Sequence, residues 1–380
     1  MVKNVCIGLG NAGSMIIKAL SESNNLKDVA LYAIDSQTAN VTLDSINRIN
    51  YISIISDDKN GSGRDRERGC AMFEYHADNG TFNDMYNECN EASDPIIVIS
   101  SAAGGTGSGS IVPLCKTLIE HGRQVIPYII CPALDDPEAF HLNTNDLLYE
   151  LNELGEGIKS YSIFRNIKNS MNYTQINKEI VESIEIILGK KYNITNADSI
   201  DESDLDKILL TPGRFVALNV EATDIESLNK ETIRKIFTGH QPAWTPEQAE
   251  EHTFVTAFSL TSLFANDDYD KAFHDVNERI INCYDNYRNV CNNDNNGKCS
   301  ATMIIAGLPS PEVKLFNNEF KVAKTIGDGV SKSRRPSFMS SKNNKKSFTN
   351  KPTNTFANKK STVNNATDDI SVDNYFTNVK

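Results

Sequence analysis

The chain has 380 residues, enough for about two domains of roughly 150 residues and a tail. Its formal net charge is −12, but ten basic and three acidic residues occur from 331 to 380, which leaves 28 basic and 47 acidic residues before them. An acidic body repels phosphate backbones, so we expect no direct DNA binding by the body and assign any such contact to the basic tail.

The longest apolar runs, at 95–99 and 125–131, are far shorter than the roughly 18 residues that a membrane span needs. No charged segment followed by an apolar one begins the chain, so we expect no export signal, no membrane contact and a location in the cytoplasm of a bacterial host. The eight cysteines form no C-x-x-C pair, and Cys6 and Cys131 lie in apolar runs. We therefore expect structural thiols rather than metal ligands.

The first half of the chain alternates short apolar runs with amphipathic stretches. The runs predict strands at 5–9, 29–34, 51–55, 96–101, 125–131 and 161–164, and helical spacing of apolar residues predicts helices at 11–22 and 108–121. Strands separated by helices are typical of a parallel sheet. We predict a doubly wound α/β domain over 1–169, followed by a central helix at 173–188 within a spacer of residues 170–194.

The order of elements changes in the second half. We predict strands at 215–220, 254–260 and 301–306 and helices at 225–237 and 269–290, which together make a smaller α+β domain over 195–310. A further helix at 311–326 falls in a segment of residues 311–330. Residues 331–380 are rich in Lys, Asn, Ser and Thr with few aliphatic side chains, so we predict a tail that is disordered when free.

Two glycine-rich segments carry the chemistry. Gly8-Leu9-Gly10-Asn11-Ala12-Gly13 follows the first strand and opens the first helix, and Asp35 ends the second strand, as in a dinucleotide-binding fingerprint. Glycine lets a pyrophosphate approach the N–H groups at the positive end of a helix. By itself this motif is also compatible with a tight turn that binds no ligand.

The second segment, Ala103-Gly-Gly-Thr-Gly-Ser-Gly109, follows the most apolar strand and opens another helix. It predicts a second anion-binding nest on the same sheet edge, and two such loops indicate a long polyphosphate. A redox dinucleotide fold uses one loop of this kind, and a P-loop needs a lysine after the last glycine, where this chain has Ser110.

The second segment resembles the G-G-G-T-G-[ST]-G signature of the tubulin/FtsZ superfamily, and the resemblance extends over most of residues 1–310. It implies a GTPase that binds GTP or GDP with Mg²⁺ through four phosphate loops: loop 1 (10–14), loop 2 (33–36), loop 3 (61–69) and loop 4 (103–109). The implied nucleotide contacts are Gly10, Asn11, Ala12, Ser14, Asp35, Gly61, Gly63, Arg64, Ala103, Gly104, Gly105, Thr106, Gly107 and Ser108. In the family loop 3 senses the γ-phosphate; alternatively, Arg64 belongs to a solvated helix face with the two arginines that follow it.

The resemblance also implies the remaining parts of the site. A fifth loop at 131–138 would contact the ribose, with Asp136 and Glu138 both candidates. Tyr173 would stack on guanine, and Asn177 and Asn166 would pair with its edge because a carboxamide offers both donor and acceptor. Without the resemblance, Tyr173 reads as a core residue and Asn177 as a helix cap.

Hydrolysis in this family is completed by the next subunit, whose acidic loop orients the attacking water. The matching segment is 196–206, and Asp201-x-x-Asp204 fits the family pattern best, with Ser199 where the family has asparagine. Asp201 and Asp204 are the catalytic candidates, with no protein ligand expected for a metal. The alternative is an acidic, capped entry to a helix that ends near Leu210.

Within the superfamily the chain resembles most the plasmid- and phage-borne bacterial branch, TubZ. This implies a head-to-tail filament that segregates plasmid or phage DNA through a centromere-binding adaptor, to which the basic tail binds; the alternative for the tail is a solubilising role. Two other functions stay open: a division-ring or phage-positioning tubulin, and an NAD-dependent Rossmann enzyme. The enzyme would leave 103–109 and 173–177 unexplained.

Overall fold

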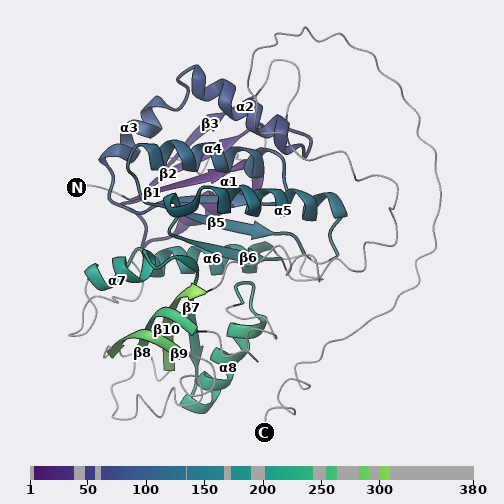
Figure 1. Ribbon diagram of the computed structural model, residues 1–380. Coiled ribbons are helices and arrows are strands. Elements are labelled where there is room, and N and C mark those ends of the chain that lie inside the picture. Colours follow the sequence, from purple (N-terminus) through teal and green to yellow (C-terminus); the bar gives the residue numbers. More distant parts are fainter. Residues whose placement is uncertain are drawn as a thin grey trace, which may run out of the picture. The chain divides into compact units, whose positions relative to one another are not determined.

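The computed structural model describes residues 4–37, 48–55, 61–133, 135–166, 173–189, 202–242, 254–262, 282–290 and 299–308 (Figure 1). All of them belong to the first of two compact units, Met1–Ile326. The described strands form a sheet of ten strands in the order β3-β2-β1-β4-β5-β6-β7-β10-β8-β9.

The first six strands are parallel and make the doubly wound sheet that the sequence predicts. Their bounds are β1 Val5–Leu9, β2 Ala30–Asp35, β3 Ile49–Ser53, β4 Ile96–Ser101, β5 Val125–Cys131 and β6 Ser160–Arg165. The strand order reverses direction at β1, because β2 and β3 lie on one side of it and β4 to β6 on the other. The doubly wound fold is thereby confirmed, with strand ends within about two residues of those predicted.

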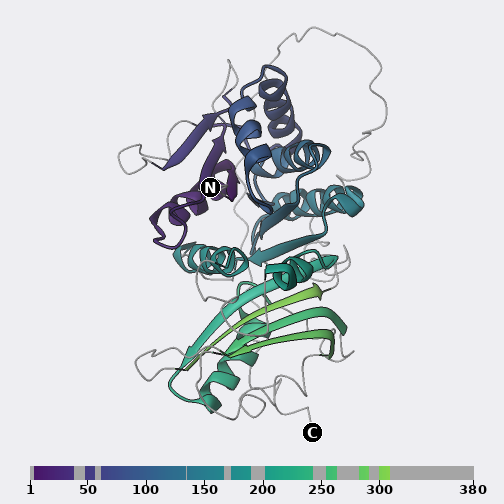
Figure 2. The ribbon, with the colours of Figure 1, turned by 90° about the vertical axis from the view of Figure 1, so that its left-hand side faces the viewer.

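Helices cover both faces of this sheet (Figure 2). One face is covered by α1 Gly10–Glu22, α6 Tyr173–Ile187 and α7 Glu202–Leu209, and the other by α2 Arg66–Asp78, α3 Asn83–Glu91, α4 Thr106–Glu120 and α5 Glu138–Glu153. Residues of β1 alternate between the two cores: Cys6 packs with the α1 side, whereas Val5, Ile7 and Leu9 pack with the α4 side. Burial on both faces explains why these strands are continuous apolar runs.

The sheet continues into a mixed second part. Its elements are β7 Gly213–Ala222, α8 Ile225–Thr238, β8 Phe254–Ser262, β9 Asn282–Val290 and β10 Cys299–Leu308. The first two residues of β7 pair in parallel with the start of β6, and β10 then lies antiparallel between β7 and β8. The side chain of Asp224 caps α8 by accepting a hydrogen bond from the Ser227 amide at 2.8 Å.

The predicted helix at 269–290 is wrong over residues 282–290, which form β9 paired in parallel with β8. Cys283, Tyr287 and Val290 recur at helical spacing, but Cys, Tyr, Val and Asn are weak helix formers, and this segment pairs with β8 along most of its length. The helix at 311–326 and the tail at 331–380 lie outside the described residues. The division of the chain at residues 169, 194, 310 and 330 stays a prediction.

Among the described residues, no helix is both long and apolar enough to span a membrane.

Candidate nucleotide-binding site

The candidate site lies where the parallel strands end. Loop 1 follows β1, loop 2 ends β2 and loop 4 follows β4, and these three strands are neighbours in the sheet. The carboxyl ends of parallel strands meet at one edge, which is the usual binding edge of doubly wound sheets. The structure therefore brings the two glycine-rich segments together, as the sequence predicts.

Loops 1 and 4 touch through their backbones. A Cβ atom on Gly10 would lie 2.9 Å from the Gly107 nitrogen, and one on Gly107 would lie 2.7 Å from the Leu9 oxygen. Gly10 also has a φ angle of +68°, which favours glycine. Both positions require glycine because any side chain would push the two loops apart.

The two helices that begin here leave their first N–H groups uncapped. Neither α1, which begins at Gly10, nor α4, which begins at Thr106, has a side-chain cap or an acidic residue in its first turn. By contrast, α2 is capped by Asp65 and α8 by Asp224. N–H groups without a side-chain cap at the positive end of a helix dipole suit an anion, and here two such ends meet at one point.

Three hydroxyl groups join loops 2, 3 and 4. The Ser36 and Thr106 hydroxyls lie 2.6 Å apart, and Thr106 also donates to the Ser62 hydroxyl at 3.0 Å. All three side chains are buried. Ser36 and Ser62 lie in the predicted loops 2 and 3 but were not named as nucleotide contacts, because nothing in the sequence shows that positions 36, 62 and 106 meet.

Loop 3 has an unusual backbone. Gly61 and Gly63 have positive φ angles of +83° and +66°, and Arg64 is the one non-glycine residue with positive φ among the described residues, at +67°. The Arg64 guanidinium carbon lies 4.6 Å from the centre of the Phe140 ring, in a cation–π contact. The predicted phosphate-contacting charge of Arg64 is therefore held on an aromatic ring of α5.

The remaining residues of loops 1 and 2 are polar and enclosed. The Ser14 hydroxyl is buried and has no hydrogen-bond partner, so loop 1 offers an unsatisfied donor. Asp35 is buried, its carboxylate accepts from the Ser36 amide at 2.7 Å, and burial raises its pKa. Asn11 and Ala12 lie in the first turn of α1, and Ser108 in that of α4, where its hydroxyl donates to the Gly104 carbonyl.

The two ribose candidates differ in their surroundings. The Asp136 carboxylate accepts a hydrogen bond from the Ala133 amide at 2.8 Å and so stabilises the turn before α5. Glu138 is exposed in the first turn of α5. A structural role accounts for Asp136, whereas Glu138 is available to a ligand.

The predicted base-binding residues lie at the same edge of the sheet. Asn166 follows β6, and its amide donates to the Cys131 carbonyl at the end of β5, at 3.2 Å. Tyr173 begins α6 with its side chain 64% exposed, and Asn177 lies one turn further on, half-buried. Tyr173 is thus not a core residue, which removes the alternative reading of that position.

The catalytic candidates are only partly described. Asp204 lies in α7 and is half-buried, whereas Asp201 lies outside the described residues. The Ser160 hydroxyl, at the first residue of β6, donates to the Leu209 carbonyl at 2.5 Å, so the end of α7 lies at the amino edge of the sheet. This edge is opposite to the phosphate loops of the same chain.

A residue at these loops that sequence reasoning missed is Asn143 of α5. Its side-chain amide donates to the carbonyls of Arg64 at 3.1 Å, Ala103 at 3.1 Å and Gly104 at 3.3 Å. One asparagine therefore joins loop 3 to loop 4. No motif marks it, because its partners lie 39 to 79 residues away.

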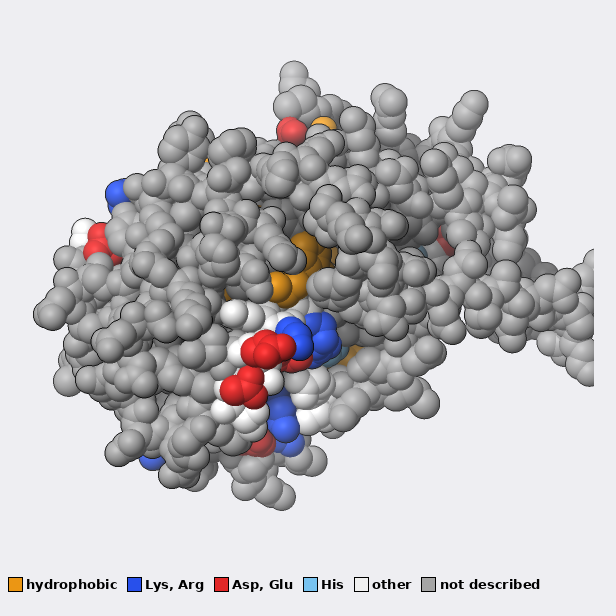
Figure 3. Space-filling view, turned by 90° about the horizontal axis from the view of Figure 1, so that it is seen from below, with side chains coloured by type: hydrophobic (Ala, Val, Ile, Leu, Met, Phe, Trp, Pro, Cys, Tyr) orange, Lys and Arg blue, Asp and Glu red, His pale blue; other side chains and the backbone are white. Residues whose placement is uncertain are grey.

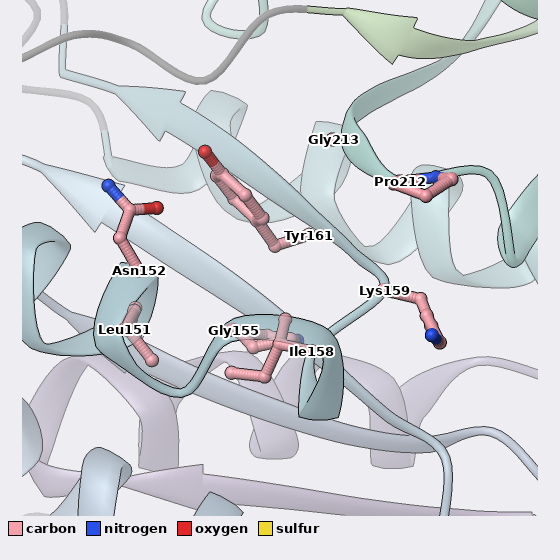
Figure 4. Close-up of a pocket in the computed structure, with 9 residues that line it drawn as sticks. Leu151, Asn152, Gly155, Ile158, Lys159, Tyr161, Pro212 and Gly213 are labelled. Carbon is pink, nitrogen blue, oxygen red and sulfur yellow. The ribbon is translucent and has the colours of Figure 1, made fainter.

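A cavity of about 430 Å³ lies away from these loops (Figure 4). It is lined by the end of α5, the start of β6 and the start of β7, including Leu151, Ile158, Tyr161 and Gly213. These are amino ends of strands, so the cavity lies at the opposite edge from loops 1 to 4. We place the nucleotide at the loops because a polyphosphate binds backbone amides on an open edge rather than an apolar hollow.

The exposed side of α8 carries paired charges. Two ion pairs lie along it, Glu226 with Lys230 at 2.8 Å and Glu231 with Arg234 at 2.5 Å. Figure 3, seen from below, shows acidic and basic side chains side by side among the coloured residues. Such mixed charge is typical of a solvated helix surface. Among the described residues, no group of three His, Cys, Asp or Glu side chains could hold a metal ion.

Solved structures of TubZ, CetZ and FtsZ proteins share this fold, a doubly wound sheet that continues into a mixed second part, with a central helix between them. No protein-family model and no curated protein sequence matches the chain.

Three solved structures illustrate the likeness in fold. TubZ of Clostridium botulinum phage c-st has a TM-score of 0.63 at 14% identity, covering 84% of this chain and 98% of that one. CetZ2 of Haloferax volcanii, a GTPγS-bound protofilament, has a TM-score of 0.63 at 18% identity, covering 85% and 100%. FtsZ of M. jannaschii, an empty dimer, has a TM-score of 0.61 at 12% identity, covering 81% and 88%.

Proposed function

We propose that this chain is a GTPase that assembles head to tail into a tubulin-like filament. The observation that carries the proposal is the contact of Gly10 with Gly107, which brings two uncapped helix N-termini together at the carboxyl edge of the sheet. Two such ends present two sets of backbone N–H groups to one ligand, which suits a chain of phosphates such as that of a nucleoside triphosphate. The fold likeness to CetZ2 in a GTPγS-bound protofilament supports both parts of the proposal.

The phosphates would be held by loops 1 and 4, with loop 3 beside them. The unpaired Ser14 hydroxyl is a donor for which a phosphate oxygen is a fitting partner. Guanine would stack on the exposed Tyr173 ring and pair with Asn177 and Asn166, and Glu138 would contact the ribose. An exposed tyrosine at the start of a helix is suited to stacking on a base.

Mg²⁺ would neutralise the phosphate charge. Among the described residues of loops 2 to 4, the oxygen groups that would bind Mg²⁺ are the hydroxyls of Ser36, Ser62 and Thr106 and the carboxylate of Asp35. Mg²⁺ commonly keeps several waters and binds through one or two protein oxygens together with substrate phosphates, and these residues fit that pattern.

Hydrolysis would need a second copy of the chain. α7 ends at the amino edge of the sheet, and Asp204 lies five residues, or about 7.5 Å along the helix, before that end. A six-residue strand separates this edge from the phosphate loops by about 20 Å. Asp201 and Asp204 would therefore act on the nucleotide of a neighbouring subunit, where they would orient the attacking water.

The filament would segregate plasmid or phage DNA through a centromere-binding adaptor. The basic segment 331–380 suits an anionic surface such as adaptor-coated DNA, whereas the acidic body does not. The fold likeness to a phage TubZ supports this role. The alternative is a division-ring or phage-positioning tubulin, in which the tail binds a different partner.

Sedimentation with different nucleotides tests the proposal. We expect the protein to pellet with GTP and Mg²⁺ and to remain in the supernatant with GDP. Titration with NADH, followed by its fluorescence, tests the Rossmann-enzyme alternative, for which we expect no binding. Protein that stays in the supernatant with GTP while it binds NADH would overturn the filament proposal.

A further inference from the structure

Asn143 makes an arrangement of hydrogen bonds that is unusual for one side chain. Its amide nitrogen lies 3.1 Å from the carbonyl oxygen of Arg64, 3.1 Å from that of Ala103 and 3.3 Å from that of Gly104. A carboxamide has two N–H hydrogens, so three carbonyl oxygens share them. The first carbonyl belongs to loop 3 and the other two to loop 4.

The same turn of α5 also holds the side chain of Arg64. Phe140, three residues before Asn143 and therefore on the same side of the helix, lies under the Arg64 guanidinium. Arg64 has a φ angle of +67°, a conformation that persists in a non-glycine residue only when its surroundings enforce it. We define the α5 clamp as Phe140 and Asn143. Phe140 contacts the Arg64 guanidinium and Asn143 donates to the Arg64 carbonyl, so the clamp holds both the side chain and the backbone of Arg64.

The position of loop 3 indicates which end of a nucleotide it would meet. α1 and α6, with the candidate base-binding residues at the start of α6, pack on one face of the sheet, whereas α2 and α4 pack on the other. Along loop 4, loop 1 touches Gly107 and loop 3 touches Gly105. A nucleotide with its base at α6 would cross the sheet edge past loop 1 and reach loop 3 with its terminal phosphate.

We propose that Asn143 is a positioning residue that fixes loop 3 against loop 4, and that it thereby sets how strongly the site prefers a nucleoside triphosphate to a diphosphate. The proposal rests on the function proposed above. Asn143 does not contact the nucleotide itself; its effect passes through the carbonyls of Arg64, Ala103 and Gly104. Losing the clamp would loosen loop 3, which the hydrogen bond between Thr106 and Ser62 still joins to loop 4, and would leave loops 1 and 4 able to hold a diphosphate.

Binding of GTPγS and of GDP, measured by calorimetry at a protein concentration where no polymer forms, tests the proposal. We expect Asn143→Ala to weaken GTPγS binding about tenfold and GDP binding less than threefold. Asn143→Asp should weaken GTPγS binding at least as much, because an ionised carboxylate is only an acceptor and would face three carbonyl oxygens. Asn152→Ala, an exposed asparagine on the same helix, is the matched control and should leave both affinities unchanged.

A second variant guards against a folding defect. Phe140→Leu removes the ring beneath Arg64 but keeps the Asn143 amide, and we expect a smaller loss of GTPγS affinity with the same selectivity. Equal weakening of GTPγS and GDP in the Asn143 and Phe140 variants would overturn the clamp, while leaving the proposed function intact. Wild-type protein that binds neither nucleotide would overturn the proposed function and the clamp with it.

Discussion

Alanine substitutions at two glycines of loop 4, Gly104 and Gly107, distinguish an effect on nucleotide binding from an effect on folding. A Cβ atom on Gly107 would lie 2.6 Å from the Ser100 hydroxyl oxygen and 2.7 Å from the Leu9 carbonyl oxygen, whereas 3.4 Å is the start of ordinary contact. A Cβ atom on Gly104 would meet nothing within 4 Å, and its φ angle lies outside the left-handed region. Alanine at 107 must therefore move backbone, while alanine at 104 only fills open space.

Gly107→Ala should mainly lower the stability of the fold, whereas Gly104→Ala should mainly lower the affinity for the nucleotide. Gly107→Ala should destabilise the fold by about 1–3 kcal/mol through overpacking, offset in part by roughly 1 kcal/mol of helix propensity because Gly107 lies in α4. Gly104→Ala should change stability by no more than about 0.5 kcal/mol. If a phosphate occupies the space beside Gly104, its methyl group displaces one charge-assisted hydrogen bond, which costs about 1.5–3 kcal/mol or roughly tenfold to hundredfold in affinity.

The assay combines melting of the nucleotide-free protein with calorimetric GTP titration. We expect Gly104→Ala to melt like the wild type but bind GTP at least about tenfold more weakly. Gly107→Ala should melt several degrees lower and bind still more weakly. Gly104→Ala protein with wild-type GTP affinity would refute the assignment of phosphate to loop 4.

Three further predictions concern other parts of the chain. Replacing both Asp201 and Asp204 with alanine should leave polymerisation intact and slow phosphate release by about a hundredfold, as judged by pelleting and a phosphate assay on one sample; normal release would exclude catalysis by these residues. Burial raises the pKa of Glu179, but hydrogen bonds from His240 and Gln175 outweigh it and lower the pKa, so Glu179 stabilises the fold above its ordinary pKa and that stability is lost as the pH falls. His240→Ala should therefore melt lower than the wild type at neutral pH and lose less melting temperature between about pH 7 and pH 3, because the pKa of Glu179 is then lowered less; parallel profiles would contradict the linkage. Arg66 donates two hydrogen bonds to the Glu150 carboxylate, at 3.1 and 2.8 Å, so Arg66→Lys should lower the free energy of unfolding in urea by about 1–2 kcal/mol, and no change would show that the paired geometry contributes nothing.

The sheet could be predicted from the sequence because its strands are buried on both faces. Residues 96–99 and 125–131 are apolar throughout, and a strand buried on both faces accounts for such a run. Residues 282–290 were predicted wrongly because their strand depends on pairing with β8, a contact that helical spacing does not reveal.

The candidate site likewise contains residues that the sequence predicts and residues that it does not. Gly10 and Gly107 could be found from the sequence because a close approach of backbones leaves a glycine pattern. Asn143 and the hydroxyls of Ser36 and Ser62 leave no pattern, since any polar residue fits an amphipathic helix or a loop. Their roles depend on distances through space between loops that are far apart in the chain.

Phosphate release against protein concentration, with GTP and Mg²⁺ and with light scattering recorded in the same cuvette, tests the central claim most directly. The account predicts that turnover and scattering appear together above a threshold concentration, because the active site is completed by a second subunit. Turnover proportional to concentration, without scattering, would contradict it and would place a complete active site within one chain.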